Sequence, residues 1–268
     1  MNRISLLGIP HDDNSSFMKG AAAAPGPIRR ELLSDAYSIW SETGIDLGVA
    51  GRLVDHGDVQ FGAGDPWDLI EQAVGRALES GDPLICLGGD HAITHPIMRA
   101  VRRRHSRLTI VHIDAHADIY HAYQDNLRSH ASPFARITEE RLTDRLIQIG
   151  IRTVNDHHRE QFARFGVEVI EMARWEADLR LDIQTPIYIS LDLDGLDPAF
   201  APGVSHREPG GPSTRQVINL IQSLNQPIVG SDIVEYNPQC DFGNMTATVA
   251  AKLLKEMAGM MIKNKKVS

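Results

Sequence analysis

The residues with the clearest chemistry are Asp114, His116 and Asp118, which follow the apolar run 108–113 at every second position. Side chains two residues apart in an extended chain point the same way and lie about 6.6–6.8 Å apart, so three of them can converge where a strand passes into a loop. Two carboxylates and one imidazole suit a divalent cation such as Mn²⁺, Mg²⁺, Co²⁺, Ni²⁺ or Zn²⁺. Alone, the triplet is equally compatible with a solvated turn, so its meaning depends on what other segments contribute.

Other apolar runs also end in ionisable residues. Runs 83–87, 187–191 and 228–234 lead respectively into Asp90 and His91, Asp192 and Asp194, and Glu235. In open parallel sheets, ligands bind outside the carboxyl ends of the strands. Because random surface decoration would not segregate in this way, we expect these side chains to gather at one edge of a sheet.

A candidate ligand set consists of His91, Asp114, His116, Asp118, Asp192 and Asp194. A single Zn²⁺ needs about three or four ligands. Four carboxylates and two imidazoles, with some carboxylates bridging, suit two divalent cations about 3.5–4 Å apart with a water between them. The carboxylate charges offset those of two dications. Hard oxygen ligands with two histidines favour Mn²⁺ over Zn²⁺, with Co²⁺ or Ni²⁺ as further candidates.

The composition restricts the classes of partner. The chain of 268 residues has a formal net charge of −8 and a pI near 5.8, which argues against binding to nucleic acid or to an anionic membrane surface. No apolar run is long enough to span a bilayer. Two distant cysteines, Cys86 and Cys240, make no disulfide framework, which fits a reducing cytoplasm. We therefore expect a cytoplasmic protein without nucleic-acid or membrane partners.

Short apolar strands alternate with helical stretches along the chain. Strands are predicted at 4–9, near Leu53, and at 83–87, 108–113, 146–151, 167–170, 187–193 and 228–234. Helices are predicted at 28–33, 65–80, 94–104, between the loop 120–132 and the strand 146–151, and at 156–165, 213–224 and 245–262. Apolar runs without alternation are typical of strands buried on both faces of a parallel sheet. We expect a three-layer α/β/α fold with about eight mostly parallel strands, in a single domain over residues 1–268.

The motifs also resemble those of a known family, the ureohydrolases, which includes arginases and agmatinases. The matching segments are 88–91, 114–118, 129–132, 190–198 and 235–238, in the family's order along essentially the whole chain. Segments 14–17, 129–137 and 199–206 are most similar to plant-type arginases and their bacterial relatives. The resemblance implies an arginase-like fold, a binuclear manganese centre and a homo-oligomer (trimer or hexamer). It also implies an enzyme that hydrolyses a guanidino substrate to urea and an amine.

The resemblance further implies a role for each site residue. One cation would be held by His91, Asp114, Asp118 and Asp192, and the other by His116, Asp114, Asp192 and Asp194, with Asp114 and Asp192 bridging. Asp194 would also hold a hydroxide between the cations. Glu235 would bind the substrate guanidinium, and His130 would transfer protons.

The distal end of the substrate is left open by the sequence. Asn126 and Arg128 could donate to an α-carboxylate, and Asn155 lies where a contact to an amino group is expected. His206 either structures a loop or contacts the substrate. L-Arginine is the first expectation, agmatine the next and other guanidino acids the third. Two other classes are a zinc deacetylase-like hydrolase, which uses fewer carboxylates, and a non-catalytic regulatory subunit, which would be expected to lose ligands.

Several neighbouring residues are expected to be structural. Asp90 is expected to orient His91 rather than to bind metal. Asp197, which precedes Pro198, is expected to form a turn. His157 and His158 are expected to be surface or helix-cap residues.

Overall fold

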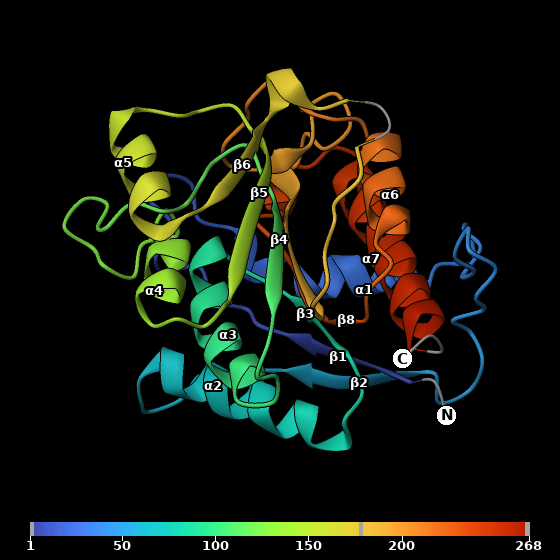
Figure 1. Cartoon of the computed structure of the whole chain (residues 1–268). Helices are drawn as coiled ribbons and strands as arrows, with labels where there is room; N and C mark the ends of the chain where they lie inside the picture. The colour runs from blue at the N-terminus through green and yellow to red at the C-terminus, as the bar shows by residue number, and fades with distance from the viewer. Residues whose placement is uncertain (1–2, 177–178, 266–268) are drawn as a thin grey trace.

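A parallel sheet forms the centre of the molecule. The computed structural model describes residues 3–176 and 179–265, and within them eight strands form one sheet in the order β2-β1-β3-β8-β7-β4-β5-β6 (Figure 1). The strands are β1 (Ile4–Gly8), β2 (Leu53–Asp58), β3 (Leu84–Leu87), β4 (Thr109–Ile113), β5 (Arg145–Ile151), β6 (Glu168–Glu171), β7 (Ile187–Asp192) and β8 (Ile228–Val234). Every pairing between neighbours is parallel, which confirms the predicted sheet.

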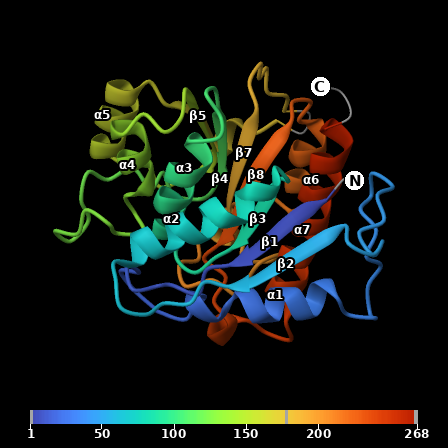
Figure 2. The ribbon, with the colours of Figure 1, turned by 90° about the horizontal axis from the view of Figure 1, so that it is seen from below.

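Helices cover both faces of this sheet. They are α1 (Pro25–Leu32), α2 (Pro66–Ala77), α3 (Thr94–Arg102), α4 (Pro133–Glu139), α5 (Asp156–Phe165), α6 (Thr214–Ser223) and α7 (Met245–Asn264). Apolar residues of α1, α6 and α7 share one core cluster with the sheet. Those of α2, α3, α4 and α5 pack in a second cluster on the other face (Figures 1 and 2). The three-layer architecture is therefore confirmed.

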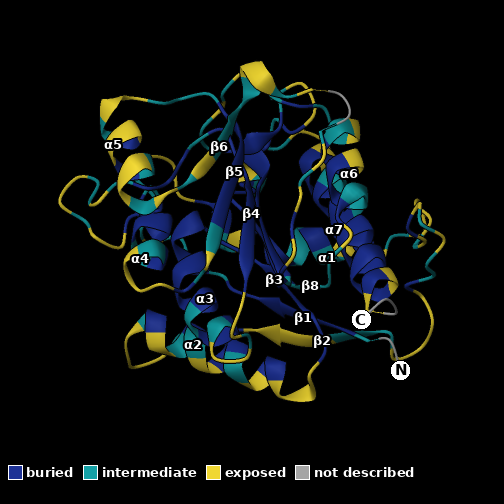
Figure 3. Cartoon of the chain, in the orientation of Figure 1, coloured by how far each residue is buried: buried dark blue, intermediate teal, exposed yellow. Residues whose placement is uncertain are grey.

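Burial decreases from the centre of the sheet to its edge. Every residue of β3, β4 and β7 is buried, whereas β2 at the edge is half-buried to exposed (Figure 3). Continuous apolar sequence in the central strands follows from this arrangement, because both of their faces meet a helical layer. Strand β2 has one neighbour only, which explains its weaker sequence signal.

Local sequence sets the starts of the helices. Asp65 accepts a hydrogen bond from the Trp67 N–H, and Pro66 takes the first helical position of α2. Ser213 forms a capping box with Gln216 at the start of α6, as its position in the sequence predicts. The main differences from prediction are small shifts at helix ends: α1 begins at Pro25, α2 passes into a 3₁₀ turn at Leu78–Ser80, and α7 continues to Asn264.

The strand order determines which motifs meet. Strands β3, β8, β7 and β4 are consecutive in the sheet, so the segments that follow their carboxyl ends lie side by side. These are the segments in which the sequence concentrates acids and histidines. Among the described residues, no helix is both long and apolar enough to cross a membrane.

Candidate functional site

The turns at the strand ends aim side chains inward. After β3, Asp90 caps a 3₁₀ turn that begins with His91. After β7, Asp192 accepts a hydrogen bond from the Asp194 N–H, which holds both carboxylates on one short turn. A Cβ atom on Gly195 would lie 2.8 Å from the Asp114 Cα atom, so glycine is required where this turn approaches β4. Close backbone packing therefore brings the two aspartate motifs together.

One cluster of ligand-type atoms surrounds the Nδ1 atom of His91. This atom lies 3.2 Å from Asp114 Oδ2, 3.0 Å from Asp118 Oδ2 and 3.1 Å from Asp192 Oδ2. All of these residues are buried. Nevertheless, none of the three oxygens meets His91 Nδ1 in the geometry of a hydrogen bond. The nitrogen and the three oxygens therefore converge without hydrogen bonds between them. This is the arrangement expected around a shared cation.

A second cluster adjoins the first through Asp114. His116 Nδ1 lies 3.5 Å from Asp114 Oδ1 and 3.2 Å from Asp194 Oδ2. The other carboxylate oxygen of Asp194 is buried and has no hydrogen-bond partner. Since Asp114 contributes one oxygen to each cluster, it is placed to bridge two cations. The structure thus brings all members of the candidate ligand set into two adjoining groups.

The carboxylates in this region are buried and close together, so a positive charge among them would be stabilising. Burial raises the pKa of Asp192 well above its usual range, and the negative charges of Asp194 and Asp114 raise it further. Burial likewise raises the pKa of Asp194 to about 7. A divalent cation would offset both effects, because it stabilises the ionised carboxylates in a poorly solvated site. The residues present therefore fit a metal centre.

A buried hydrogen-bond chain orients the ring of His91. The hydroxyl groups of Ser190, Tyr188 and Thr94 each donate to the Asp232 carboxylate. Ser190 donates its only hydroxyl proton to Asp232. Its oxygen therefore accepts a hydrogen bond from His91 Nε2–H at 2.9 Å. The ring thus faces the carboxylates with Nδ1, the nitrogen that would bind a metal ion.

Asp90 does not perform the orienting role that the sequence suggests. Its carboxylate accepts hydrogen bonds from the backbone N–H groups of Asn14 and Ala92. It therefore fastens a loop and caps a turn, while Ser190 and Asp232 orient His91. Asp197 does form a turn, since its carboxylate accepts from the Ala199 and Gly210 N–H groups.

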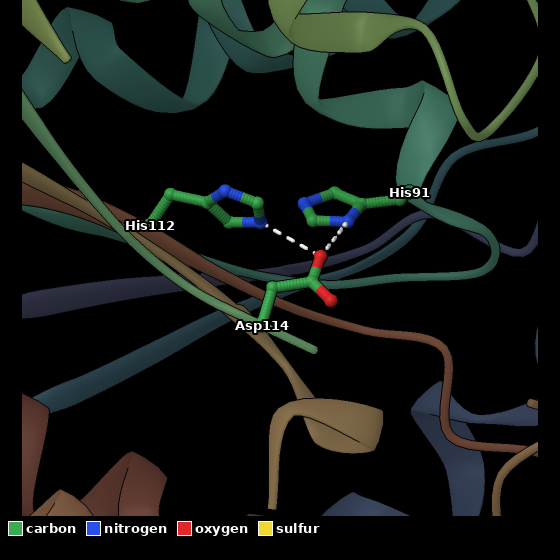
Figure 4. A group of neighbouring side chains, drawn as sticks. All are labelled: His91, His112 and Asp114. Carbon is green, nitrogen blue, oxygen red and sulfur yellow. Dashed lines mark hydrogen bonds and ion pairs between the residues drawn. The ribbon is translucent and has the colours of Figure 1, made fainter. Parts of the chain in front are cut away.

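His112 is a residue that the motif analysis missed. Its Nε2 atom lies 2.8 Å from Asp114 Oδ2 (Figure 4). Its Nδ1 atom accepts from the Gln148 amide. Burial lowers the pKa of His112, so the neutral ring donates its one N–H to Asp114. The sequence feature that could have identified His112 is its position two residues before Asp114, on the same face of the strand. His112 therefore holds Asp114 in place rather than offering a lone pair.

A cavity of about 210 Å³ opens beside the clusters. Its lining residues are Ser16, His116, Asp118, Tyr120, Tyr123, His130, Ala131, Thr153, His158, Asp192, Asp194, His206, Glu208 and Glu235. His130 Nδ1 lies 3.0 Å from Glu235 Oε1, which also accepts the His91 backbone N–H. Burial alone would lower the pKa of His130, but the Glu235 carboxylate raises it to about 9. The predicted proton carrier and the predicted guanidinium ligand thus share one cavity.

Both Asp118 and Glu235 adopt left-handed backbone conformations, with φ of 44° and 62°. Residues with a Cβ atom rarely occupy this region, and such strain concentrates at functional sites. At Glu235 the conformation ends β8, while a backbone bond from Glu235 N–H to Gly89 O fastens it to the end of β3. The chain therefore maintains strained geometry where two proposed site residues face the cavity.

Three of the predicted substrate contacts lie elsewhere. Asn126 donates to the side chain of Asn14. Arg128 pairs with Asp65 and lies over the Trp67 ring. Asn155 caps α5 and donates to the Tyr120 hydroxyl. None of the three lines the cavity, whereas His206 does.

Comparison with known proteins identifies the family. The Arginase family profile matches residues 2–259. The mitochondrial arginase 1 of Arabidopsis thaliana is 44% identical over 97% of this chain and 81% of its own length. The solved arginase of Medicago truncatula superimposes with a TM-score of 0.90 at 41% identity, covering 97% of this chain and 87% of that one. The chain belongs to the arginase family.

Membership of the arginase family confirms the resemblance and makes the chain a hydrolase of guanidino substrates. The family also contains relatives with other names. The N(1)-aminopropylagmatine ureohydrolase of Thermus thermophilus is 35% identical over 91% of this chain and 86% of its own length. The arginase family thus contains proteins that are named for different guanidino substrates.

The mouth is formed largely by residues that motif analysis did not select. We call the mouth that part of the cavity lining made by Tyr120 and Tyr123 after β4, Thr153 after β5, His158 in α5 and Glu208 after β7. His158 was expected to be a helix cap, and its Nδ1 atom does accept the Asn155 N–H at the start of α5. Its buried Nε2 atom has no hydrogen-bond partner, however, and the residue lines the cavity. No pattern in one sequence distinguishes these two uses of a helix-cap histidine.

Proposed function

We propose that this arginase-family protein is a manganese-dependent enzyme that hydrolyses L-arginine to L-ornithine and urea. The observation that carries the proposal is the pair of adjoining buried clusters joined by Asp114, beside a cavity that also contains Glu235 and His130. The similarity to plant arginases over nearly the whole chain supports arginine as the substrate. The proposal extends to a single catalytic domain over residues 1–268.

Two cations would be held at the clusters described above, and Asp192, which lies in the His91 cluster, would reach the second cation as an additional bridge. One would take His91, Asp114, Asp118 and Asp192, and the other His116, Asp114, Asp192 and Asp194. Mn²⁺ is the proposed ion because of the oxygen-rich ligand set, and Co²⁺ or Ni²⁺ are the first substitutes to test. When bound, two such cations would lower the pKa of a water between them and supply the attacking nucleophile, with Asp194 placed to hold it.

Glu235 would bind and orient the substrate guanidinium. A guanidinium is a planar cation, and one carboxylate can accept two parallel hydrogen bonds from it. The Glu235 carboxylate is buried and faces the same cavity as Asp192 and Asp194. Burial alone would raise the pKa of Glu235, but the positive charge of His130 lowers it below the usual range. Glu235 is therefore ionised and ready for a cationic group.

His130 would protonate the leaving amine. Its pKa of about 9 keeps the ring protonated at neutral pH, so it can act as a general acid. The guanidinium would share the Glu235 carboxylate with His130, so the ring stays protonated beside the scissile C–N bond. Transfer of the proton would release the amine and leave urea.

The mouth contains groups suited to an amino-acid head group. Tyr120 accepts from Asn155, so its hydroxyl proton is free to donate into the cavity. His158 offers an unpartnered nitrogen, and His206 also lines the wall. Glu208 is an acid outside the ligand set, and it could accept an ammonium group. The hydroxyl and ring N–H donors would match the α-carboxylate of arginine. The Glu208 carboxylate would match its α-ammonium group.

Agmatine is the second candidate, because no lysine or arginine is among the residues that line the cavity. A substrate carboxylate would then rely on neutral donors alone. An ω-guanidino amine needs only the acid, Glu208, at its distal end. Asn126, Arg128 and Asn155 remain predicted contacts that would require loop movement, since they bind other residues.

Assembly and location are also proposals. We propose a homo-oligomer, either a trimer or a hexamer, on the basis of the family resemblance. We propose a cytoplasmic location from the cysteine usage, although several plant relatives are named mitochondrial. Fractionation with antibody detection and light scattering of the purified protein test these two points.

The activity is tested by urea release from a panel of L-arginine, agmatine, 4-guanidinobutyrate and formimidoylglutamate. The purified chain is loaded with Mn²⁺, Co²⁺ or Ni²⁺, and its metal content is measured on the same sample. We expect the highest kcat/KM for arginine with Mn²⁺. Preference for agmatine would replace the substrate assignment, and no urea from any compound by metal-loaded protein would overturn the proposal.

A further inference from the structure

The Ser16 hydroxyl is hydrogen-bonded to the ring nitrogen of His130 that Glu235 does not contact. Ser16 Oγ lies 2.8 Å from His130 Nε2, while His130 Nδ1 lies 3.0 Å from Glu235 Oε1. Both nitrogens of the ring are therefore engaged. All three side chains line the same cavity.

The loop that carries Ser16 is fastened on two sides. The Asn14 N–H donates to Asp90 at the end of β3, and the Ser15 hydroxyl reaches the same carboxylate at 3.4 Å. The Asn14 carbonyl accepts the His130 backbone N–H. The position of Ser16 relative to His130 is consequently set by the backbone of both segments and not by the serine side chain alone.

A hydroxyl group can serve either protonation state of the imidazole. A protonated ring donates from Nε2 to the Ser16 oxygen, which leaves the serine proton free to donate into the cavity. After the ring loses its Nε2 proton, the serine hydroxyl can donate back to that nitrogen. No heavy atom has to move between these two states, which is the property of a proton relay.

We propose that Ser16 relays the proton from His130 Nε2 to the leaving amine of the substrate. As the C–N bond of the substrate breaks, the amine nitrogen takes the Ser16 hydroxyl proton and Ser16 Oγ takes the Nε2 proton of His130. One N–H bond and one O–H bond break, one O–H bond and one N–H bond form, and neutral His130 is later reprotonated from solvent. The inference rests on the proposed function of this same cavity.

The test compares Ser16→Thr with Ser16→Val, because threonine and valine have nearly the same shape and differ in the hydroxyl group. Positioned proton transfer is worth about 10²–10⁴-fold in rate, so loss of one relay step should lower kcat by about 10–10²-fold in the valine variant. The threonine variant should retain kcat within about threefold of the wild-type value. KM and metal content should be unchanged in both, and a solvent deuterium isotope effect on kcat should grow in the valine variant.

Ser15→Ala is the matched control, since Ser15 bonds Asp90 and does not line the cavity. We expect it to keep the wild-type kcat. Equal kcat for the threonine and valine variants would overturn the relay, as would a loss confined to KM or metal content. Circular dichroism establishes that each variant folds, and Ser16→Ala against Ser16→Thr repeats the comparison if the valine variant does not. Failure of the proposed function is distinguishable, because then the wild-type protein itself releases no urea.

Discussion

The inner end of the cavity and its mouth are built in different ways. At the inner end, the segments after β3, β4 and β7 place carboxylate oxygens 3.0–3.5 Å from the Nδ1 atoms of His91 and His116. At the mouth, Tyr120 accepts a hydrogen bond from Asn155, and outside the cavity Arg128 pairs with Asp65. Strand register therefore positions the ligand-type atoms, whereas we propose that loop-to-loop contacts influence which substrate reaches them. Changes at the two ends should have separable effects.

The largest effect is expected for Asp192→Asn. The amide keeps an oxygen for the Asp194 N–H but removes the charge that faces His91. We expect loss of bound metal together with a fall in urea formation of about 10³-fold or more, because metal catalysis contributes several kcal/mol. Elemental analysis and urea assays on one sample measure both. Asp197→Asn, at a nearby turn, is the control, and full activity with full metal content in Asp192→Asn would contradict the ligand assignment.

Glu235→Gln should separate chemistry from metal binding at the inner end. A hydrogen bond to a charged group contributes about 1.5–3 kcal/mol, so kcat/KM should fall by about 10–10²-fold. Metal content should stay at the wild-type value, since Glu235 lies outside the ligand set. If the variant instead lost metal, Glu235 would belong to the metal centre and the division between the two ends would need revision.

Tyr120→Phe should alter substrate choice at the mouth. The ring can still stack on His157, while the hydroxyl and the hydrogen bond that it accepts from Asn155 are lost. One hydrogen bond is worth about 1 kcal/mol, so kcat/KM for arginine should fall by about fivefold while that for agmatine changes less. Equal losses for both compounds, measured at constant metal content, would argue that Tyr120 does not contact the distal group.

The smallest effect is expected for Arg128→Ala. Its exposed ion pair with Asp65 contributes about 0–1 kcal/mol to the free energy of unfolding, and the Trp67 contact adds a similar amount at most. Urea denaturation should show this modest loss, with the KM for arginine within about twofold of wild type. A tenfold rise in KM without loss of stability would instead support the predicted substrate contact.

The contrast between the two ends also explains what the sequence could predict. Asp114, His116 and Asp118 follow a buried strand at alternate positions, and a parallel sheet brings such strand ends to one edge. Their approach to His91 and Asp192 follows from these two rules. The eight parallel strands were predictable for the same reason, because buried strands have continuous apolar sequence.

Other features required the three-dimensional structure. The hydrogen-bond chain from Asp232 through Ser190 to His91 joins residues that are distant in sequence. Ser190 and Asp232 each look like an ordinary strand residue when taken alone. His158 satisfies the pattern of a helix cap and also faces the cavity. Arg128 was expected to contact substrate, but a loop residue has no periodicity from which its direction can be predicted.

The central claim is that the inner end of the cavity holds two divalent cations joined by Asp114 and Asp192. The most direct measurement is Mn²⁺ titration of the metal-free wild-type protein, followed by electron paramagnetic resonance and elemental analysis. The account predicts two tightly bound Mn²⁺ ions per chain with the spectrum of a spin-coupled pair. One isolated Mn²⁺ per chain at full urea-forming activity would contradict it.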